Sequence, residues 1–332
     1  GMRAAIAPGE RWQNHLVHAD GEDHHFLQSL PPDLRERMLR VQERRNRLSP
    51  EAYVSAVSGL AADFARDELI SVWFGPTGPQ WTPEPVLREI VRAAELKDTR
   101  IQTHVLESYY ESLESPRSRS KRLLPYLNNI GLLSERASLA HMVWSDPQDF
   151  ELLVQSRVQI CCNPSSNLRL RSGVAPAARY RAAGIPLAVG MDGTTLADDE
   201  DMFAEMRLAL NLNRPPHQKS KALTAQDVFS MATAGGAALL GRGQELGQLT
   251  PGYRADAVLI DIKRMTTPWA DPDVDPLVLI LTRGRRDDVR DVFVGGYQKV
   301  RSGRVLGVDE RALCVVGRFR AIQRSRRHQD LG

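Results

Sequence analysis

The chain has 332 residues, hydrophobic side chains at 42% of positions and a formal net charge of +3, which excludes a disordered chain and fits one large globular domain, or one large and one small. No apolar run reaches the roughly 18 residues of a membrane span, and the N-terminus lacks the order of a signal peptide, so we expect a cytoplasmic protein. The three cysteines cannot build a disulfide framework. Positive charge gathers near the C-terminus and predicts a basic, solvated tail, with no nucleic-acid partner.

Short apolar runs alternate with helical patterns from the N-terminus onward, which is the order of a parallel sheet wrapped in helices. The predicted strands are Met2–Pro8, Leu69–Phe74, Arg100–His104, Ser138–Val143, Arg157–Cys162 and Pro186–Met191. A helical pattern follows each strand, as at Pro83–Lys97 and Asp199–Asn213. Six strands predict either an open doubly wound sheet or an eight-stranded barrel without its first two strands.

Two further segments interrupt this alternation. The charged helical stretch Pro31–Ala65 lies between the first two predicted strands, and we expect it to cap one face of the barrel. After the helix predicted at Thr224–Leu240, the segment Gly247–Val308 contains short strand patterns separated by Pro-Gly, Gly-Gly and Ser-Gly turns, which predicts a small appended sheet. The glycines of Gly241–Gly247 lack both a preceding strand and the dinucleotide-binding spacing, so we exclude a nucleotide site there.

Three polar residues stand at the ends of predicted strands: His104 after RIQT, His141 after SLA and Asp192 after PLAVGM. In a parallel barrel, active sites are assembled at the carboxyl ends of the strands. Taken singly, each histidine fits a hydrogen-bonded structural residue and the aspartate fits a helix N-cap. Convergence from nearly successive strands favours a site. Glu107, three residues beyond His104, lies where a carboxylate can reach over a metal held by that histidine.

Several strings resemble the amidohydrolase superfamily, in the expected order and spacing: THVLE (103–107), AHMVW (140–144), CNPSSNLRLRSGVAP (162–176), GMDG (190–193) and DMFAEMRLAL (201–210). The similar branches contain cytosine deaminase, adenosylhomocysteine deaminase, guanine and 8-oxoguanine deaminases and triazine hydrolases. The string TPGYRADAVLID (250–261) resembles the strand that returns to this family's small β-sandwich domain. The resemblance covers nearly all of the chain.

The resemblance implies an α/β fold, a TIM-like (β/α)8 barrel with about six of its eight strands visible and a small C-terminal β-sandwich remnant. We therefore expect the barrel in residues 1–246, the β-sandwich in residues 247–310 and the basic tail in residues 311–332.

The resemblance also implies roles for single residues. His104 corresponds to a metal ligand on the fifth barrel strand, and Asp192 to the ligand and proton acceptor on the eighth. Glu107 corresponds to the acid/base that protonates a ring nitrogen, and His141 to the histidine that orients the attacking hydroxide and contacts the metal. Three further residues lie where relatives contact substrate or shape the pocket: Gln80, Trp81 and Asn167.

The implied reaction is metal-dependent hydrolytic deamination of a nitrogen heterocycle such as an amino-purine, a pyrimidine or a triazine. The implied metal is divalent, zinc with iron as the alternative. Arg169 and Arg171 are the cations on the predicted pocket loops, which favours a neutral substrate over a phosphorylated one. Family members often form dimers, so we expect a homo-oligomer.

The sequence departs from the family in two respects. It has no HxH pair, which in the family supplies two metal ligands from the first strand. It begins with GMRAAIAP, which resembles the third strand, so we expect the family's N-terminal portion to be missing. Solvated or capping roles are the better interpretation of His15 with His18 and of His24 with His25. The alternative to an enzyme is a catalytically incomplete barrel that acts as an interaction module and binds no stoichiometric metal.

Overall fold

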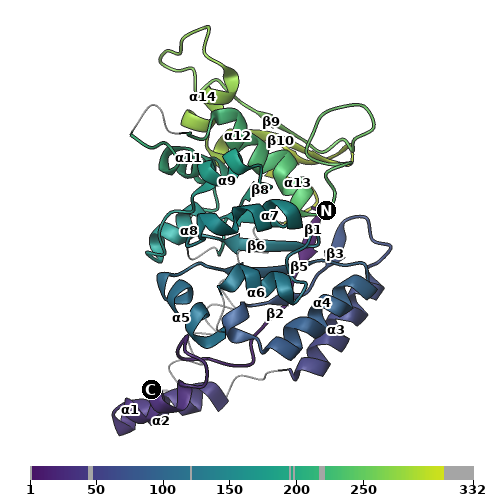
Figure 1. The fold of residues 1–332 in the computed structure, drawn as a ribbon. Coiled ribbons are helices and arrows are strands. Elements are labelled where there is room, and N and C mark those ends of the chain that lie inside the picture. Colours follow the sequence, from purple (N-terminus) through teal and green to yellow (C-terminus); the bar gives the residue numbers. More distant parts are fainter. Residues whose placement is uncertain are drawn as a thin grey trace.

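Six parallel strands form the centre of the computed structural model, which describes residues 2–43, 48–119, 122–193, 196, 199–216 and 221–309 (Figure 1). In chain order they are β1 (Ala4–Ile6), β3 (Ile70–Val72), β5 (Ile101–Val105), β6 (Ala137–His141), β7 (Gln159–Cys162) and β8 (Leu187–Val189). β1 pairs with β3, and β5 to β8 pair in chain order. A parallel bridge from Phe74, beyond β3, to Ile101 of β5 connects the two groups. All six predicted strands are therefore found, in the order of a barrel wall.

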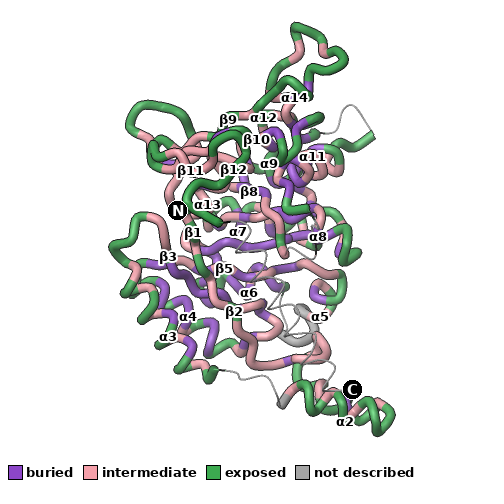
Figure 2. Tube along the Cα trace, turned by 180° about the vertical axis from the view of Figure 1, so that it is seen from behind, coloured by how far each residue is buried: buried purple, intermediate pink, exposed green. Residues whose placement is uncertain are grey.

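β6 illustrates why these segments are strands. All of its residues are buried, from Ala137 to His141, because a strand inside a parallel sheet is covered on both faces. In the register, Leu139 lies between Thr103 of β5 and Ile160 of β7, and all three side chains are buried. Figure 2 shows the buried residues along these strands and exposed residues on the outer helices and loops.

The helices between the strands have one buried face. In α4 (Glu84–Leu96) the buried positions Leu87, Ile90, Val91 and Ala94 recur every three or four residues, which is the spacing of one helical face. The other helices of the barrel are α5 (Tyr109–Arg119), α6 (Leu123–Asn129), α7 (Phe150–Ser156), α8 (Pro164–Arg169), α9 (Ala177–Ala183), α11 (Met202–Leu212), α12 (Ala225–Ser230), the π-turn η3 (Met231–Gly235) and α13 (Gly236–Leu239). Shorter elements lie in the loops: β2 (Gly9–Glu10), β4 (Gly75–Pro76), and the 3-10 turns η1 (Pro79–Trp81) and η2 (Pro147–Asp149).

The stretch predicted as one helical cap at Pro31–Ala65 is two helices, preceded by α1 (Asp23–Ser29). α3 (Pro50–Asp63) buries Tyr53 and Val57 in the core and packs beside α4 and β3. α2 (Pro32–Glu43) lies beside α1, and the two project from the body of the structure (Figure 1). α3 is therefore held against the core, whereas α2 has no buried apolar position, and the cap over one face of the barrel stays a prediction.

The C-terminal described residues form one antiparallel sheet of the order β12-β11-β10-β9. Its strands are β9 (Ala257–Ile260), β10 (Val289–Val294), β11 (Tyr297–Arg301) and β12 (Arg304–Val305), and α14 (Pro276–Arg283) with the 3-10 turn η4 (Arg286–Asp288) lies between β9 and β10. Gly295 and Gly296 turn β10 into β11 with φ values of 58° and 80°, which a two-residue hairpin turn requires.

This sheet is what the structure describes of the predicted β-sandwich. The predicted boundary at residue 246 stays a prediction, and the predicted tail at 311–332 lies outside the described residues. No helix in the described part of the chain is long and apolar enough to cross a membrane.

Candidate metal centre

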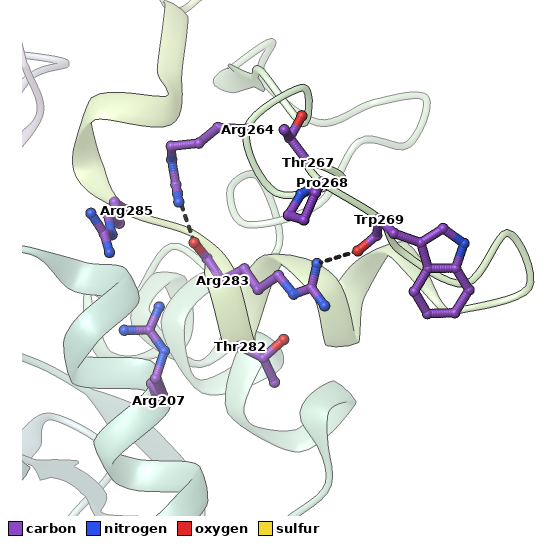
Figure 3. Close-up of a pocket in the computed structure, with 8 residues that line it drawn as sticks. All are labelled: Arg207, Arg264, Thr267, Pro268, Trp269, Thr282, Arg283 and Arg285. Carbon is purple, nitrogen blue, oxygen red and sulfur yellow. Dashed lines mark hydrogen bonds between the residues drawn. The ribbon is translucent and has the colours of Figure 1, made fainter.

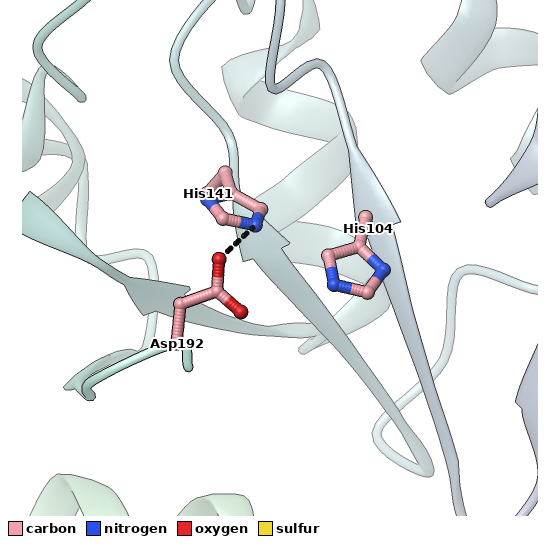
Figure 4. Close-up of side chains that lie close together, drawn as sticks. All are labelled: His104, His141 and Asp192. Atoms are coloured by element: carbon pink, nitrogen blue, oxygen red, sulfur yellow. Dashed lines mark ion pairs between the residues drawn. The ribbon is translucent and has the colours of Figure 1, made fainter. Parts of the chain in front are cut away.

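His104, His141 and Asp192 lie together at the carboxyl ends of parallel strands, as the strand order requires (Figure 4). His104 is in β5, His141 is the last residue of β6, and Asp192 follows β8. One ligand atom from each lies within 4.8 Å of the others. Two imidazoles and a carboxylate form a donor set that zinc and iron accept.

The backbone around this cluster has left-handed residues that are not glycine. Leu106 has a φ of 51°, His141 of 73° and Met142 of 48°. Such conformations destabilise ordinary residues and persist where the surroundings hold them. Here the two strand ends hold each other, because the N–H of Met142 donates to Val105 O at 3.1 Å and the N–H of Val143 to Leu106 O at 2.9 Å. The His141 side chain points toward Asp192 (Figure 4).

Both histidines are oriented through Nδ1. His104 Nδ1 lies 2.5 Å from the carbonyl oxygen of Thr77, which can only accept, so this nitrogen carries the proton. His141 Nδ1 lies 2.8 Å from Asn167 Oδ1. This pattern leaves each Nε2 as a lone-pair donor, and second partners of this kind are what metal-ligating histidines have. Ser166 Oγ donates to Asp192 Oδ2 at 2.7 Å and orients the carboxylate in the same way.

The electrostatics of His141 fit a ligand. Its Nε2 is buried without a hydrogen-bond partner and lies 3.9 Å from Asp192 Oδ2 and 3.9 Å from Glu107 Oε2. Burial lowers the pKa of His141, although the carboxylate of Glu107 and the bond to Asn167 act in the opposite direction. A neutral imidazole with an orphaned, buried nitrogen beside two carboxylates is a fit for a divalent cation.

Glu107 lies in the loop beyond β5, and its backbone is held by a second acid. The N–H of Glu107 donates to Oε2 of Glu111 at 2.9 Å. Burial raises the pKa of Glu111 to about 7. Glu111, Thr77 and Ser166 are the residues around the site that the sequence did not single out, although Thr77 and Ser166 stand in the strings GPTGPQW and CNPSSNLRLRSGVAP.

The predicted substrate residues fall into two places. Gln80 and Trp81 lie in η1, beyond β4, and both are half-buried. Asn167 lies in α8, is 1% exposed and bonds His141, so we interpret it as a residue that positions this histidine. Substrate contact by any of the three stays a prediction.

The other histidines are not in this cluster, which is the one group of possible metal ligands found among the described residues. His24 and His25 are exposed on α1, in agreement with the solvated role expected for them. His18 is half-buried and stacks on Trp81, with ring centroids 6.0 Å apart. Burial lowers the pKa of His18, opposed by the charges of Glu114 and Glu107.

The sequence profile of the amidohydrolase family matches residues 24–298, so the chain belongs to this family. The predicted family and barrel class are confirmed. The chain is 38% identical to 5'-deoxyadenosine deaminase of Methanothermobacter thermautotrophicus over 207 residues. The aligned part is 62% of this chain and 48% of that protein. Over 322 residues it is 32% identical to 8-oxoguanine deaminase of Pseudomonas aeruginosa, covering 97% of this chain and 66% of that protein.

A solved structure shares the fold. An adenosine deaminase from Xanthomonas campestris, with bound zinc, superposes with a TM-score of 0.78 at 29% identity, over 83% of this chain and 62% of that one. The chain spans about half the length of several curated relatives that it matches.

Proposed function

We propose that this chain carries the catalytic half-site of a metal-dependent deaminase that hydrolyses an exocyclic C–N bond of an amino-purine. The observation that carries the proposal is the convergence of His104, His141 and Asp192, with the Glu107 carboxylate 3.9 Å from His141 Nε2. The purine preference rests on relatives named for 5'-deoxyadenosine and 8-oxoguanine. Zinc is the proposed metal, because the donor set accepts it and one related structure has it bound.

The roles of the side chains follow from their places. His104, His141 and Asp192 would hold the divalent ion, and a bound divalent cation would supply a water whose pKa is lowered towards about 7. Asp192 accepts the proton of the attacking water, since its carboxylate is partly exposed and oriented by Ser166. Glu107 would protonate the ring nitrogen as the water adds at the carbon. Asp192 would then pass the water's proton to the amine, which leaves as ammonia, and the remaining hydroxyl proton would return to Glu107 as the carbonyl forms.

The test separates metal binding from chemistry. We expect about one equivalent of zinc or iron per chain by elemental mass spectrometry, lost in Asp192→Ala and kept in Glu107→Gln. Ammonia release from 5'-deoxyadenosine and 8-oxoguanine should be lost in both variants. Asp287→Asn, at a carboxylate with 88% of its side chain exposed and outside the cluster, is the matched control and should change neither.

A chain that binds no metal above background refutes catalysis by these residues alone and supports the interaction module. The described residues contribute three ligands, and the HxH pair of the family is absent from the sequence, so metal content is the decisive measurement. The cytoplasmic location and the homo-oligomer stay predictions from the sequence.

A further inference from the structure

Four arginines surround a cavity of about 550 Å³ that none of the candidate metal ligands lines (Figure 3). The cavity lies between α11, α14 and the loop after β9. Arg207 comes from α11, Arg264 from the loop, Arg283 from the last position of α14, and Arg285 from just beyond it. Residues far apart in the sequence therefore place guanidinium groups around one space.

Two of these arginines are held by neutral groups. Arg207 Nε donates to Leu281 O at 3.1 Å, and its Nη2 donates to Gly284 O. Arg283 Nη1 donates to Met265 O at 2.7 Å and to Trp269 O at 3.0 Å. Carbonyl oxygens fix the orientation of both guanidinium groups but carry no compensating charge. The remaining N–H groups of both forks are still available to a ligand.

The compensating negative charge at the cavity is small. Asp288 bonds Arg264, with 2.8 Å between Arg264 Nε and Asp288 Oδ1. Arg285 is close enough to Asp288 to help lower the pKa of that carboxyl group, so one carboxylate faces both Arg264 and Arg285. Asp271 accepts from the N–H of Asp273 at 3.0 Å, and Asp275 caps α14 by accepting from the N–H of Leu277 at 2.8 Å. Neither carboxylate lines the cavity.

We propose that this cavity is a binding site for a phosphate-bearing anion, distinct from the candidate metal centre. Like charges gathered around one space repel each other, and an oxyanion removes that repulsion. The planar fork of arginine matches phosphate oxygens through paired N–H bonds. The cavity is in the size range of sites for small organic ligands, so it has room for a pyrophosphate or a nucleoside diphosphate.

The test is calorimetric titration of the full chain with inorganic pyrophosphate at low salt. We expect one saturable site per chain, weakened by added sodium chloride because the attraction is electrostatic. Arg285→Gln is the informative variant, since it removes one cavity charge while Asp288 keeps its bonds to Arg264 and to the backbone N–H of residue 285. Binding should weaken about tenfold or more, as for the loss of one charge-assisted pair. Arg88→Gln, an exposed arginine on α4, is the matched control and should bind as the unchanged chain does.

The same titration with ADP distinguishes the two sources of the phosphate group. Equal affinity for ADP and pyrophosphate identifies a free polyphosphate, whereas tighter ADP binding identifies a nucleotide. The absence of saturable pyrophosphate binding at low salt overturns the proposal, and so does equal binding by Arg285→Gln and the unchanged chain. The experiment needs neither bound metal nor deamination, so its result is independent of the proposed function.

Discussion

Glu111 is a carboxyl group buried next to the candidate acid/base. It is 3% exposed, it holds the N–H of Glu107 through Oε2, and its Oε1 has no hydrogen-bond partner. Burial raises the pKa of Glu111 from an ordinary 4.5 to about 7, and the nearby charge of Glu107 acts in the same direction, whereas backbone N–H bonds oppose it. The folded protein therefore holds a proton on Glu111 over a range of pH in which the unfolded chain releases it.

The sign of the pH dependence follows. A pKa that folding raises gives a contribution to stability that is fully present below pH 4.5 and is lost as the pH rises through about 7. At about 1.4 kcal/mol per pH unit, the interval between the two values corresponds to ~3 kcal/mol of unfolding free energy. In Glu111→Gln the side chain keeps an acceptor oxygen and cannot ionise. Relative to the unchanged chain, the variant should gain ~3 kcal/mol of stability between about pH 4 and pH 8.5.

Urea unfolding at a series of pH values measures this difference, because the titration of all other groups cancels between the two proteins. Glu151→Gln, at an exposed carboxylate on α7, is the matched control and should track the unchanged chain at every pH. If the free energies of unfolding of Glu111→Gln and the unchanged chain differ by the same amount at every pH, Glu111 titrates alike in the folded protein and the unfolded chain. The reasoning from burial is then refuted.

Four other substitutions test the site and the fold. Asn167→Ala removes the hydrogen-bond partner of His141 Nδ1 and should weaken metal binding by about 10-fold to 100-fold. Competition with a chelator measures the affinity, and an unchanged affinity contradicts the positioning role. Arg157→Gly should stabilise the protein by roughly 1 kcal/mol, because this exposed residue ends α7 with a φ of 55°, a left-handed conformation that glycine adopts without strain. Gly184→Ala should destabilise the protein, because Gly184 follows α9 with a φ of 80°. Thermal melts measure both changes. Tyr53→Phe should lower the free energy of unfolding in urea by about 1–3 kcal/mol, because the Tyr53 hydroxyl accepts from the N–H of Gly75 at 2.8 Å. A smaller loss would show that this N–H finds another partner.

The sequence by itself determined the barrel wall and three residues of the candidate centre. Strand runs such as Ser138–Val143 are mainly apolar, and such a run is typical of a strand that a parallel sheet buries on both faces. Because parallel strands end at one edge, polar residues at their ends have to meet, and His104, His141 and Asp192 do. Local patterns were less informative at Pro31–Ala65, where one expected cap is two helices with different neighbours.

Only the tertiary structure decided what surrounds those residues. Thr77 reaches His104 across 27 positions and Asn167 reaches His141 across 26, and no periodicity relates such positions. Glu111 looks like an ordinary acid at the start of a helix, yet packing removes its carboxyl group from water and raises its pKa. The four arginines of the cavity come from a helix, a loop and the end of a second helix. Secondary structure follows from neighbours along the chain, whereas burial, hydrogen-bond partners and converging charges depend on which distant segments pack together.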